Sequence, residues 1–526
     1  MPQTHTPLRN VLFIMCDQLR WDYLSCYGHP LLHTPAIDEL ARRGVRFDRA
    51  YVQSPVCVPS RMSFYTGRYM RSHGATWNHV PLPSGQITLG DHLARVGREA
   101  KLAGKTHVIP DIASVERLGL PRDAADAQLR LHGGFGELDR YDGHSPPGKE
   151  SGYADYLRNH GYDGRDPWTD FVIAGDDGRG GTANGWLLRN AHLPARVREE
   201  HSETAYMTDR ALSFIEAQGE RPWVLHLSCI KPHWPLMAPA PYHAMYRDHD
   251  SGPILKGDPS NENAHPVLEA YRAAHDDCLS YGREDVVRHV RPTYMGLVKQ
   301  VDDHLKRVID LLDRSGRSKD TLIIFTADHG DHLGDHGLGE KELFYEEAVR
   351  IPMIVVDPRA SADASRGSAS GAFVESVDIV PTILDALGLP AAPHVVEGRS
   401  LAPLLEGTTP ADWRDATFSE LDFAFRDARK HLGLDVEDCT ATMVRTERWK
   451  YVHWKCFRPQ LFDLQNDPHE LVDLGDHPDH EGVRAAMRER LLAWLLDRRV
   501  RTTVDHDTVR RRTEDWRGNG LFIGVW

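Results

Sequence analysis

Long apolar runs and paired cysteines are both missing from this sequence. No stretch approaches the roughly 18 apolar residues of a membrane-spanning helix, and the apolar run nearest the N-terminus, Val11 to Cys16, stops at Asp17. Neither a membrane span nor a secretory signal peptide is therefore predicted. The 7 cysteines are an odd number without CxxC spacing, which predicts neither a disulfide framework nor a zinc ribbon. Together these absences predict a cytoplasmic protein that does not associate with membranes.

The chain also lacks an excess of basic charge, with 63 Lys and Arg against 77 Asp and Glu. The formal net charge of -14 argues against nucleic acid as a partner, because phosphate backbones are bound by basic surfaces. A small anionic substrate stays compatible with this charge if Arg, Lys and His gather locally. The 526 residues, 40% hydrophobic and 27% charged, are typical of a globular protein with one large α/β domain and a smaller one.

Five short apolar runs, each followed by a polar residue, predict buried strands because of their length and β-branched content. They comprise residues 11–16, 100–104, 222–230, 321–327 and 352–356. Amphipathic segments between them, such as 35–44 and 293–315, predict helices. This alternation predicts an open, mostly parallel sheet covered on both faces. The polar residues after the strands are then expected at the carboxyl edge, where such sheets bind ligands.

The rest of the chain divides by composition. Residues 111–200 are rich in Gly, Asp and Pro, which predicts a long insertion of loops around the mouth of a pocket. After 414 the pattern changes to antiparallel strands with turns, followed by a helix at 483–499. We therefore expect a large domain over 1–414, a small α+β domain over 415–499 and a tail over 500–526. The tail is either a frayed end or an arm that docks on a neighbouring copy.

Asp17 and the pair Asp328-His329 are candidate metal ligands because each follows a predicted buried strand. A rigid strand end can hold such side chains within about 2.0–2.6 Å of one cation. Helix capping or solvation in a loop is the alternative, and it explains most aspartates at strand ends.

The segment CVPSR begins at Cys57. Pro59 suits the first turn of a helix, so the positive end of that helix is expected at residue 57, with Arg61 one turn later. A buried cysteine ahead of a proline-started helix is the alternative interpretation. The pattern CxPxR resembles the recognition core at which formylglycine-dependent sulfatases have their cysteine oxidised. The loop TADHGDHLGDHG around Asp328 resembles the metal loop of the same family.

The resemblance, to sulfatases and to their relatives the phosphonate monoester hydrolases in the alkaline phosphatase superfamily, covers most of the chain. It implies an alkaline-phosphatase-like fold, with residues 1–414 as the catalytic domain. It also implies formylglycine at position 57, made by a formylglycine-generating enzyme, whose hydrate attacks sulfur or phosphorus while Arg61 contacts the hydrate. One divalent cation is implied. Its ligands would be Asp17, Gln18, residue 57, Asp328 and His329.

Two of these positions depart from the usual sulfatase pattern. Gln18 stands where sulfatases commonly have a second aspartate, and His329 stands where they commonly have asparagine. Both departures resemble the phosphonate monoester hydrolase branch. Fewer carboxylates and one imidazole make the site less calcium-like and more tolerant of manganese, so Ca²⁺ or Mn²⁺ is expected.

Lys105 and His107 in GKTHV resemble the sulfatase residues that contact the sulfate and the formylglycine hydrate. Phosphonate monoester hydrolases have Tyr and Thr at these two places. A cation is needed at the non-bridging oxygens and a base is needed for the second hydroxyl, so both residue types suit the chemistry.

His233 in KPHWP and Lys341 in GEKELF resemble the residues that serve the leaving-group oxygen and the substrate. The alternatives are a packing histidine between prolines and a lysine in a solvated ion pair with neighbouring glutamates. Asn78 in WNHVP matches a substrate-contacting asparagine of phosphonate monoester hydrolases. Trp77 and Trp234 adjoin candidate residues and predict either an aryl-lined pocket or ordinary core packing.

These observations predict an enzyme that hydrolyses small sulfate monoesters, aryl sulfates above all, with side activity on phosphonate monoesters or phosphodiesters. A primary phosphonate monoester hydrolase is the first alternative. A binding protein with an unmodified Cys57 and a two-zinc phosphomonoesterase are the others. We also expect a homo-oligomer, either a dimer or a tetramer.

Overall fold

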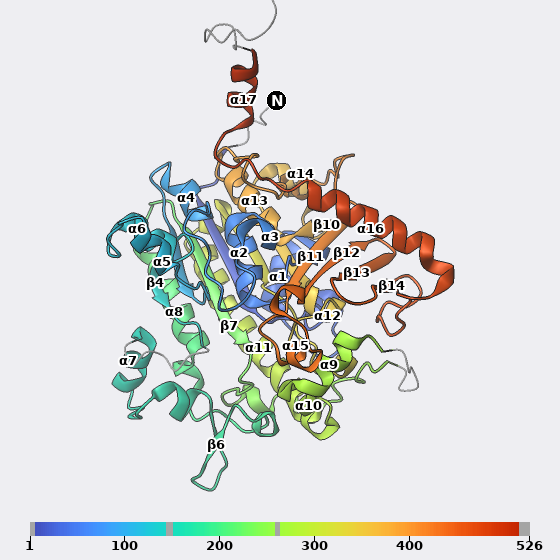
Figure 1. Cartoon of the computed structure of the whole chain (residues 1–526). Helices are drawn as coiled ribbons and strands as arrows, with labels where there is room; N and C mark the ends of the chain where they lie inside the picture. Colours follow the sequence, from blue (N-terminus) through green and yellow to red (C-terminus); the bar gives the residue numbers. More distant parts are fainter. Residues whose placement is uncertain (1–5, 144–150, 258–263, 515–526) are drawn as a thin grey trace, which may run out of the picture.

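The computed structural model describes residues 6–143, 151–257 and 264–514, and its centre is a large twisted sheet (Figure 1). Within these residues the sheet has 8 strands. Their order is β10 (Ala369–Glu375), β2 (Val45–Tyr51), β9 (Arg350–Val356), β8 (Thr321–Ala327), β1 (Asn10–Asp17), β7 (Val224–Pro232), β3 (Ala100–Gly104) and β4 (Phe135–Arg140). The five predicted strands are all confirmed, because runs buried on both faces are apolar throughout, as in β1 and β8.

The sheet is mostly parallel, as predicted, but β9 is antiparallel to both of its neighbours, β8 and β2. The expectation that every polar residue after a strand lies at the same edge is therefore wrong for Asp357. This residue follows β9 at the opposite edge, where its carboxylate pairs with Arg359 at 2.6 Å. The position of an apolar run in the sequence does not determine whether its strand is parallel or antiparallel to its neighbours. The sequence of β9 contains no feature that predicts its antiparallel direction.

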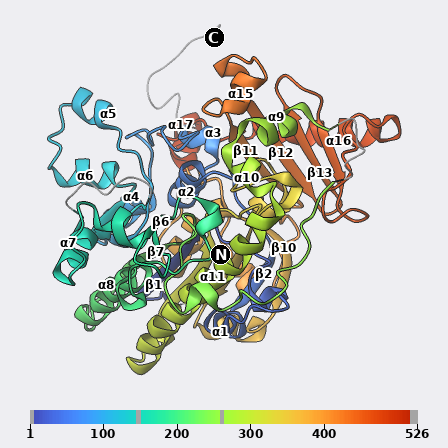
Figure 2. The same ribbon diagram turned by 90° about the horizontal axis from the view of Figure 1, so that it is seen from below.

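Helices cover both faces of the sheet (Figures 1 and 2). Helices α1 (Pro35–Arg43), α8 (Glu203–Ala217) and α11 (Glu284–Arg314) lie on one face, and α2 (Cys57–Thr66) and α4 (Leu89–Ala94) lie on the other. The predicted helix at 35–44 is confirmed, with Pro35 at its first position. The helix predicted at 293–315 begins earlier, at Glu284, because the chain stays helical through Pro292.

The expectation that residues 111–200 form loops alone is wrong. Strand β4 from this stretch pairs with β3 and completes the main sheet. The stretch also contains α5 (Ile112–Arg117), α6 (Ala125–Leu131), α7 (Gly152–Asn159) and a hairpin of β5 (Ala174–Asp176) and β6 (Thr182–Asn184). It builds a small apolar cluster of its own around Tyr153 and Trp168. Residues 144–150 lie outside the described residues.

A second sheet follows in the C-terminal part of the chain, as predicted. Its antiparallel strands are β11 (Ala416–Asp422), β12 (Thr440–Thr446), β13 (Trp449–Trp454) and β14 (Gln460–Asp463). Helix α16 (Glu481–Leu496) packs on β12 and β13 and corresponds to the helix predicted at 483–499. The sheet meets the edge of the main sheet, where Phe418 N–H donates to Glu375 at 3.0 Å. The main apolar core continues into this sheet through Met443 and Phe462.

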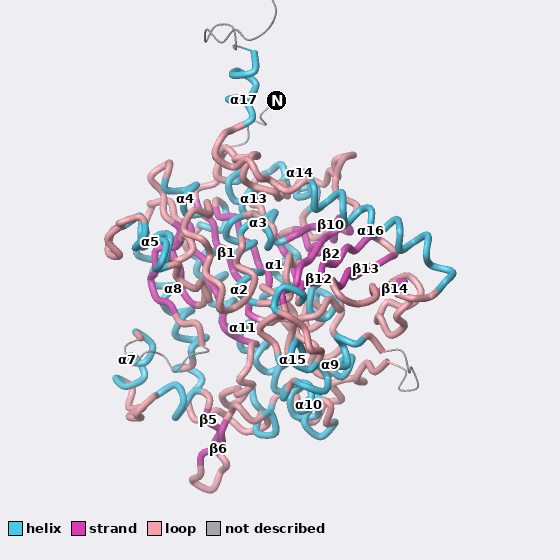
Figure 3. Tube along the Cα trace, viewed as in Figure 1, coloured by secondary structure: helices cyan, strands magenta, loops and turns pink. Residues whose placement is uncertain are grey.

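Shorter helices connect these parts. They are α3 (Met70–His73), α9 (Pro266–Ala274), α10 (Asp276–Tyr281), α12 (Glu346–Val349), α13 (Ile379–Ala386), α14 (Ala402–Leu405), α15 (Asp427–His431) and α17 (His506–Glu514). Helix α17 belongs to the predicted tail and stands away from the body of the molecule (Figure 3). The last part of the tail, 515–526, lies outside the described residues. No helix within the described ranges has both the length and the apolar character needed to cross a bilayer.

Candidate active site

Four candidate residues meet at the carboxyl edge of the main sheet. Strands β1 and β8 are parallel neighbours with Cys16 opposite Ala327, so Asp17 and Asp328 leave the sheet side by side. Cys57 begins α2, with Pro59 in its first turn as predicted. The ligand atoms of Asp17, Cys57, Asp328 and His329 all lie within 4.8 Å of one another, and all four residues are buried.

Arg61 holds the two carboxylates in place. Its Nε donates to Asp328 Oδ2 at 2.8 Å and its Nη2 donates to Asp17 Oδ2 at 2.9 Å. Its Nη1 donates to the backbone oxygen of Lys105 at 2.8 Å and to Ser228 Oγ at 2.9 Å. The guanidinium is fully buried, so these are not surface ion pairs. They fix the relative positions of three strand ends.

Asp17 is ionised and one of its oxygens is left for a ligand. The Lys105 ammonium lies 2.5 Å from Asp17 Oδ2. Burial alone would raise the pKa of Asp17, but Lys105 and the other cations around the carboxylate hold that pKa well below its usual range. Asp17 Oδ1 is buried without a hydrogen-bond donor among the described residues. Buried polar atoms are rarely left unpaired, so this oxygen is suited to a cation.

The donor set fits a divalent metal ion. It offers two carboxylates, an imidazole and the side chain of residue 57, a mixture of oxygen and nitrogen that suits manganese better than calcium. His329 Nδ1 donates to the Gly330 carbonyl at 2.9 Å, which leaves Nε2 facing the cluster. Burial would lower the pKa of His329, but the neighbouring Asp328 carboxylate raises it.

Cys57 lies against His329, with Sγ 3.2 Å from Nε2. Burial would raise the pKa of the Cys57 thiol, yet the Lys341 ammonium and its neighbours outweigh burial, and the pKa is lowered. The encoded thiol stands where the oxygens of a modified residue 57 would lie.

Gln18 contacts this cluster differently from a simple metal ligand. Its backbone N–H donates to Asp328 Oδ1 at 3.0 Å, and its side-chain Nε2 donates to Asp331 Oδ2 at 2.5 Å. Its Oε1 accepts from Lys341 Nζ at 3.2 Å. The side chain therefore bridges Asp331 and Lys341, and its role as a metal ligand stays a prediction.

His233 and Lys341 lie beside the cluster. His233 directly follows β7, and its Nε2 lies 3.7 Å from Asp17 Oδ1. Lys341 is buried, with only 5% of its surface exposed, so the alternative of a solvated ion pair is wrong. Its neighbour Glu342 accepts instead from Arg426 at 2.5 Å and from Tyr271 at 2.7 Å.

Asn78 and His107 are held through backbone groups. Asn78 Oδ1 accepts from the Val58 N–H at 3.0 Å, at the start of α2, so its amide oxygen satisfies one of the helix's first donors. The backbone N–H of His107 donates to Asp142 Oδ1 at 2.9 Å. The contacts that both side chains would make with a substrate stay predictions.

Sequence analysis did not identify three residues that support the site. Asp331 accepts from Gln18, Ser228 accepts from Arg61, and Asp142 orients the backbone at His107. Ser228 precedes the end of a predicted strand, which is a weak signal for such a role. Burial raises the pKa of Asp331 to about 6.

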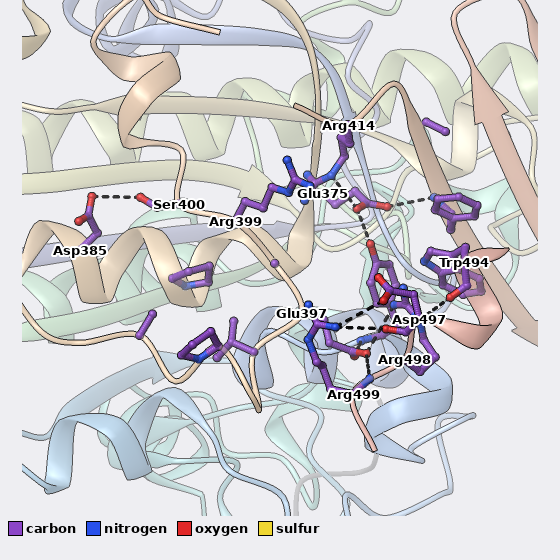
Figure 4. A pocket seen from close by; sticks show the side chains of 18 of the residues that line it. Glu375, Asp385, Glu397, Arg399, Ser400, Arg414, Trp494, Asp497, Arg498 and Arg499 are labelled. Atoms are coloured by element: carbon purple, nitrogen blue, oxygen red, sulfur yellow. Dashed lines mark hydrogen bonds and ion pairs between the residues drawn. The ribbon is translucent and has the colours of Figure 1, made fainter. Parts of the chain in front are cut away.

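A separate cavity of about 410 Å³ lies next to the C-terminal helix α16 (Figure 4). Its lining includes Arg414, Arg498, Glu375 and Glu397, and none of the candidate site residues. Arg414 lies 3.3 Å from Glu375 and Arg498 lies 3.5 Å from Glu397. Because no candidate site residue lines it, the cavity is separate from the candidate active site.

Comparison with known proteins assigns the class that this fold and site define. The sulfatase family model matches residues 9–389, and a model described as the C-terminal region of N-sulphoglucosamine sulphohydrolase matches 334–496. The chain belongs to the sulfatase family of the alkaline phosphatase superfamily and is a sulfuric ester hydrolase. This family uses a metal ion and formylglycine.

Particular relatives lie in both branches of the superfamily. The chain is 33% identical to the multifunctional alkaline phosphatase superfamily protein PehA of Trinickia caryophylli, over 95% of this chain and 97% of that protein. It is 28% identical to an arylsulfatase of Clostridium perfringens, over 93% and 95% of the two chains. The phosphonate monoester hydrolase structure from Silicibacter pomeroyi superposes with a TM-score of 0.80 at 30% identity, covering 95% of this chain and 96% of that chain.

Proposed function

We propose that this chain hydrolyses sulfate monoesters, aryl sulfates above all, with formylglycine at position 57 as the nucleophilic residue. The observation that carries the proposal is the meeting of Cys57 with Asp17, Asp328 and His329 within 4.8 Å. A nucleophile at a helix start, next to a candidate cation site, is the arrangement that attack on an anionic ester requires.

The chain's own residues support each part of this reaction. Lys105 and Lys341 place buried ammonium groups where the non-bridging oxygens of the substrate would be bound. His233 and the Lys341 ammonium that donates to it are suited to support the leaving-group oxygen, and His107 is assigned to the hydrate, with Asn78 at the substrate. Arg61 keeps Asp17 and Asp328 in position throughout.

Two groups complete the site when they are present. A single divalent cation, Mn²⁺ or Ca²⁺, held by Asp17, Asp328, His329 and residue 57 with Gln18 adjacent, would polarise the ester and the nucleophile. Formylglycine, made from Cys57 by a formylglycine-generating enzyme, would add water to form a geminal diol, whose one hydroxyl would attack while the second would lose its proton to expel the bound ester.

Lys105 supports sulfate as the preferred substrate. A sulfate monoester carries three non-bridging oxygens, whereas a phosphonate monoester has a carbon substituent in place of one. An ammonium group that faces carbon loses a hydrogen bond, which costs about 1–3 kcal/mol for a buried group. The test is kcat/KM for 4-nitrophenyl sulfate and for 4-nitrophenyl phenylphosphonate on one preparation. A higher value for the phosphonate contradicts the proposal.

A primary phosphonate monoester hydrolase is the second candidate. Its support is the 30% identity and TM-score of 0.80 to the Silicibacter pomeroyi enzyme, together with the departures at Gln18 and His329. The same assay decides between them, and side activity on the weaker class is expected. An intact thiol in active protein would favour a non-catalytic role for Cys57, and two zinc ions per chain would favour a phosphomonoesterase.

We also propose the organisation given by the sequence, with a catalytic domain over 1–414, a small domain over 415–499 and the tail over 500–526 as an oligomerisation arm. A cytoplasmic homo-oligomer, dimer or tetramer, is the corresponding assembly. Light scattering of the full chain and of a chain that ends at Arg499 tests the arm. The same number of subunits in both assemblies would contradict a role of the tail in oligomerisation.

A further inference from the structure

Two aromatic side chains stand exposed beside residues of the candidate site. Trp186 is 43% exposed and Phe425 is 54% exposed, and no other Trp or Phe within 6–143, 151–257 and 264–514 is as open to solvent. Each packs on a tryptophan that adjoins a candidate site residue. Trp186 contacts Trp234, next to His233, and Phe425 contacts Trp77, next to Asn78.

Trp234 connects the buried site to the exposed Trp186. Its ring centroid lies 4.5 Å from that of His233, and Lys341 Nζ lies 5.7 Å from the ring centroid. On the outer side the Trp186 ring lies 5.2 Å away at an interplanar angle of 60°. Three rings therefore run from His233 outward to the surface, and Trp234 itself is half-buried.

Trp77 is packed in a way that needs no ligand. It is only 4% exposed. The Phe425 ring stacks on it at 5.9 Å and 7°, and the Arg426 guanidinium lies 5.3 Å from its ring centroid. Arg426 is itself bound by Glu342. Trp77 therefore has almost no surface left for a ligand, whereas Trp234, the partner of Trp186, is only half-buried.

The backbone holds Trp186 firmly although its side chain is exposed. Gly185 N–H donates to the Ile173 carbonyl at 2.8 Å, and Trp186 N–H donates to Asn184 Oδ1 at 2.9 Å. A Cβ at residue 185 would lie 2.0 Å from Ile173 O, so only glycine allows this approach. The hairpin of β5 and β6 projects below the main sheet in Figure 1, and Trp186 follows two residues after β6 ends at Asn184. The anchored backbone and the contact with Trp234 restrict where the exposed indole can lie, which organises it in advance for contact with a ligand.

We propose that Trp186 and Trp234 form a subsite for a flat apolar leaving group, such as the aryl ring of an aryl sulfate. The inference rests on the proposed function, in which His233 serves the leaving-group oxygen. The atoms attached to that oxygen then lie next to the Trp234 ring and extend toward Trp186. Aromatic rings favour such edge and offset contacts with one another. The insertion at 111–200 thereby contributes directly to substrate specificity.

The test measures binding without turnover. The Cys57→Ala chain, loaded with Mn²⁺, is titrated by calorimetry with 4-nitrophenyl sulfate and with inorganic sulfate. Adding Trp186→Ala is expected to raise the Kd for 4-nitrophenyl sulfate roughly 3- to 10-fold and to leave the Kd for inorganic sulfate unchanged. Trp186→Phe keeps a ring and should recover most of the loss. Phe425→Ala, which removes the other exposed ring, is the matched control and should change neither Kd.

Each contrary result is distinct. An unchanged Kd for 4-nitrophenyl sulfate in Trp186→Ala, with an unchanged melting temperature, overturns the subsite while the proposed function stands. So does an equal loss in Phe425→Ala, or a loss shared equally by inorganic sulfate. A different outcome would contradict the proposed function itself: neither probe binds the Cys57→Ala chain that still has Trp186, and the unsubstituted protein does not hydrolyse aryl sulfates. In that case the subsite proposal is contradicted as well.

Discussion

Lys341 Nζ lies 3.2 Å from Nε2 of His233. A lysine ammonium can only donate, so Nε2 of His233 accepts, and the imidazole proton lies on Nδ1, which faces the Trp234 carbonyl. The two side chains thus share one hydrogen bond beside the Asp17 carboxylate. Each fixes the position of the other, and substitution of either is expected to disturb both.

His233→Ala should affect poor leaving groups most. A group that supports the departing oxygen matters more as the phenol becomes more basic, and a well-placed acid contributes roughly 10²–10⁴-fold. We expect a loss of that size in kcat/KM for phenyl sulfate and a smaller loss for 4-nitrophenyl sulfate. His453→Ala, on the exposed face of β13, is the control. Equal losses for both esters would contradict a role at the leaving group.

Residue 57 should be formylglycine in active protein. Mass spectrometry of the tryptic peptide from Ala50 to Arg61 is expected to show a mass below that of the encoded thiol peptide. The fraction modified should rise in proportion to specific activity across preparations. A fully active preparation with an intact cysteine would rule out the mechanism.

Asp328→Asn should lose metal and activity together. The substitution removes charge from a candidate ligand and weakens its bond to Arg61 Nε. Metal analysis is expected to give about one divalent ion per chain before the change and clearly less after it. Asp310→Asn, on the exposed side of α11, should keep the full metal content. Normal occupancy in Asp328→Asn would remove this residue from the ligand set.

The double substitution Lys105→Tyr with His107→Thr should shift specificity from sulfate toward phosphonate esters. We expect the ratio of the two kcat/KM values to change by about one to two orders of magnitude, on the scale of tenfold per 1.4 kcal/mol. Lys105 also pairs with Asp17, so some loss of both activities accompanies the shift. A purely parallel loss would assign these residues to charge stabilisation alone.

Asp302 should make stability fall as pH rises through the mildly acidic range. Burial raises its pKa to about 6, although its Oδ1 accepts from the Ala36 and Ile37 N–H groups at the start of α1. The folded state therefore holds this proton more tightly than the unfolded chain, whose carboxyl titrates near its usual value. The stabilisation present below pH 4 is lost as pH rises toward 6.

The measurement compares Asp302→Asn with the unsubstituted protein. The substitution keeps an acceptor for α1 but removes the titration. Its free energy of unfolding relative to the unsubstituted protein should rise by roughly 3 kcal/mol between pH 4 and pH 7. Asp310→Asn on the same helix controls for surface charge. A difference that does not depend on pH would contradict the raised pKa.

The strands that could be predicted are those whose two faces are both buried. β1 and β8 are continuous apolar runs, which fixes their state without any partner. β2, with the sequence VRFDRAY, alternates charged and apolar residues because part of it is only half-buried, and it was not predicted. The reversed direction of β9 depends on pairing with β2, which no local pattern carries.

The candidate site residues that directly follow a predicted strand could be identified from the sequence. Asp17 and Asp328 each follow an apolar run, and neighbouring parallel strands bring them together. The supporting contacts could not be predicted because they join distant parts of the chain. Arg61 and Ser228 are 167 positions apart, and Gln18 and Asp331 are 313 apart. Only the folded structure gives such pairs.

The complete burial of α2 bears on whether the proposed modification of Cys57 comes before or after folding. All 10 residues of this helix are buried, and Cys57 has no exposed surface. An enzyme that oxidises Cys57 would have to bind the chain around this residue, and in the folded protein that segment is not accessible. If residue 57 is modified as proposed, the modification is therefore expected to precede folding. Protein that folds before it is modified would then be expected to keep its thiol, and the proposed formylglycine-generating enzyme would reach Cys57 only after unfolding.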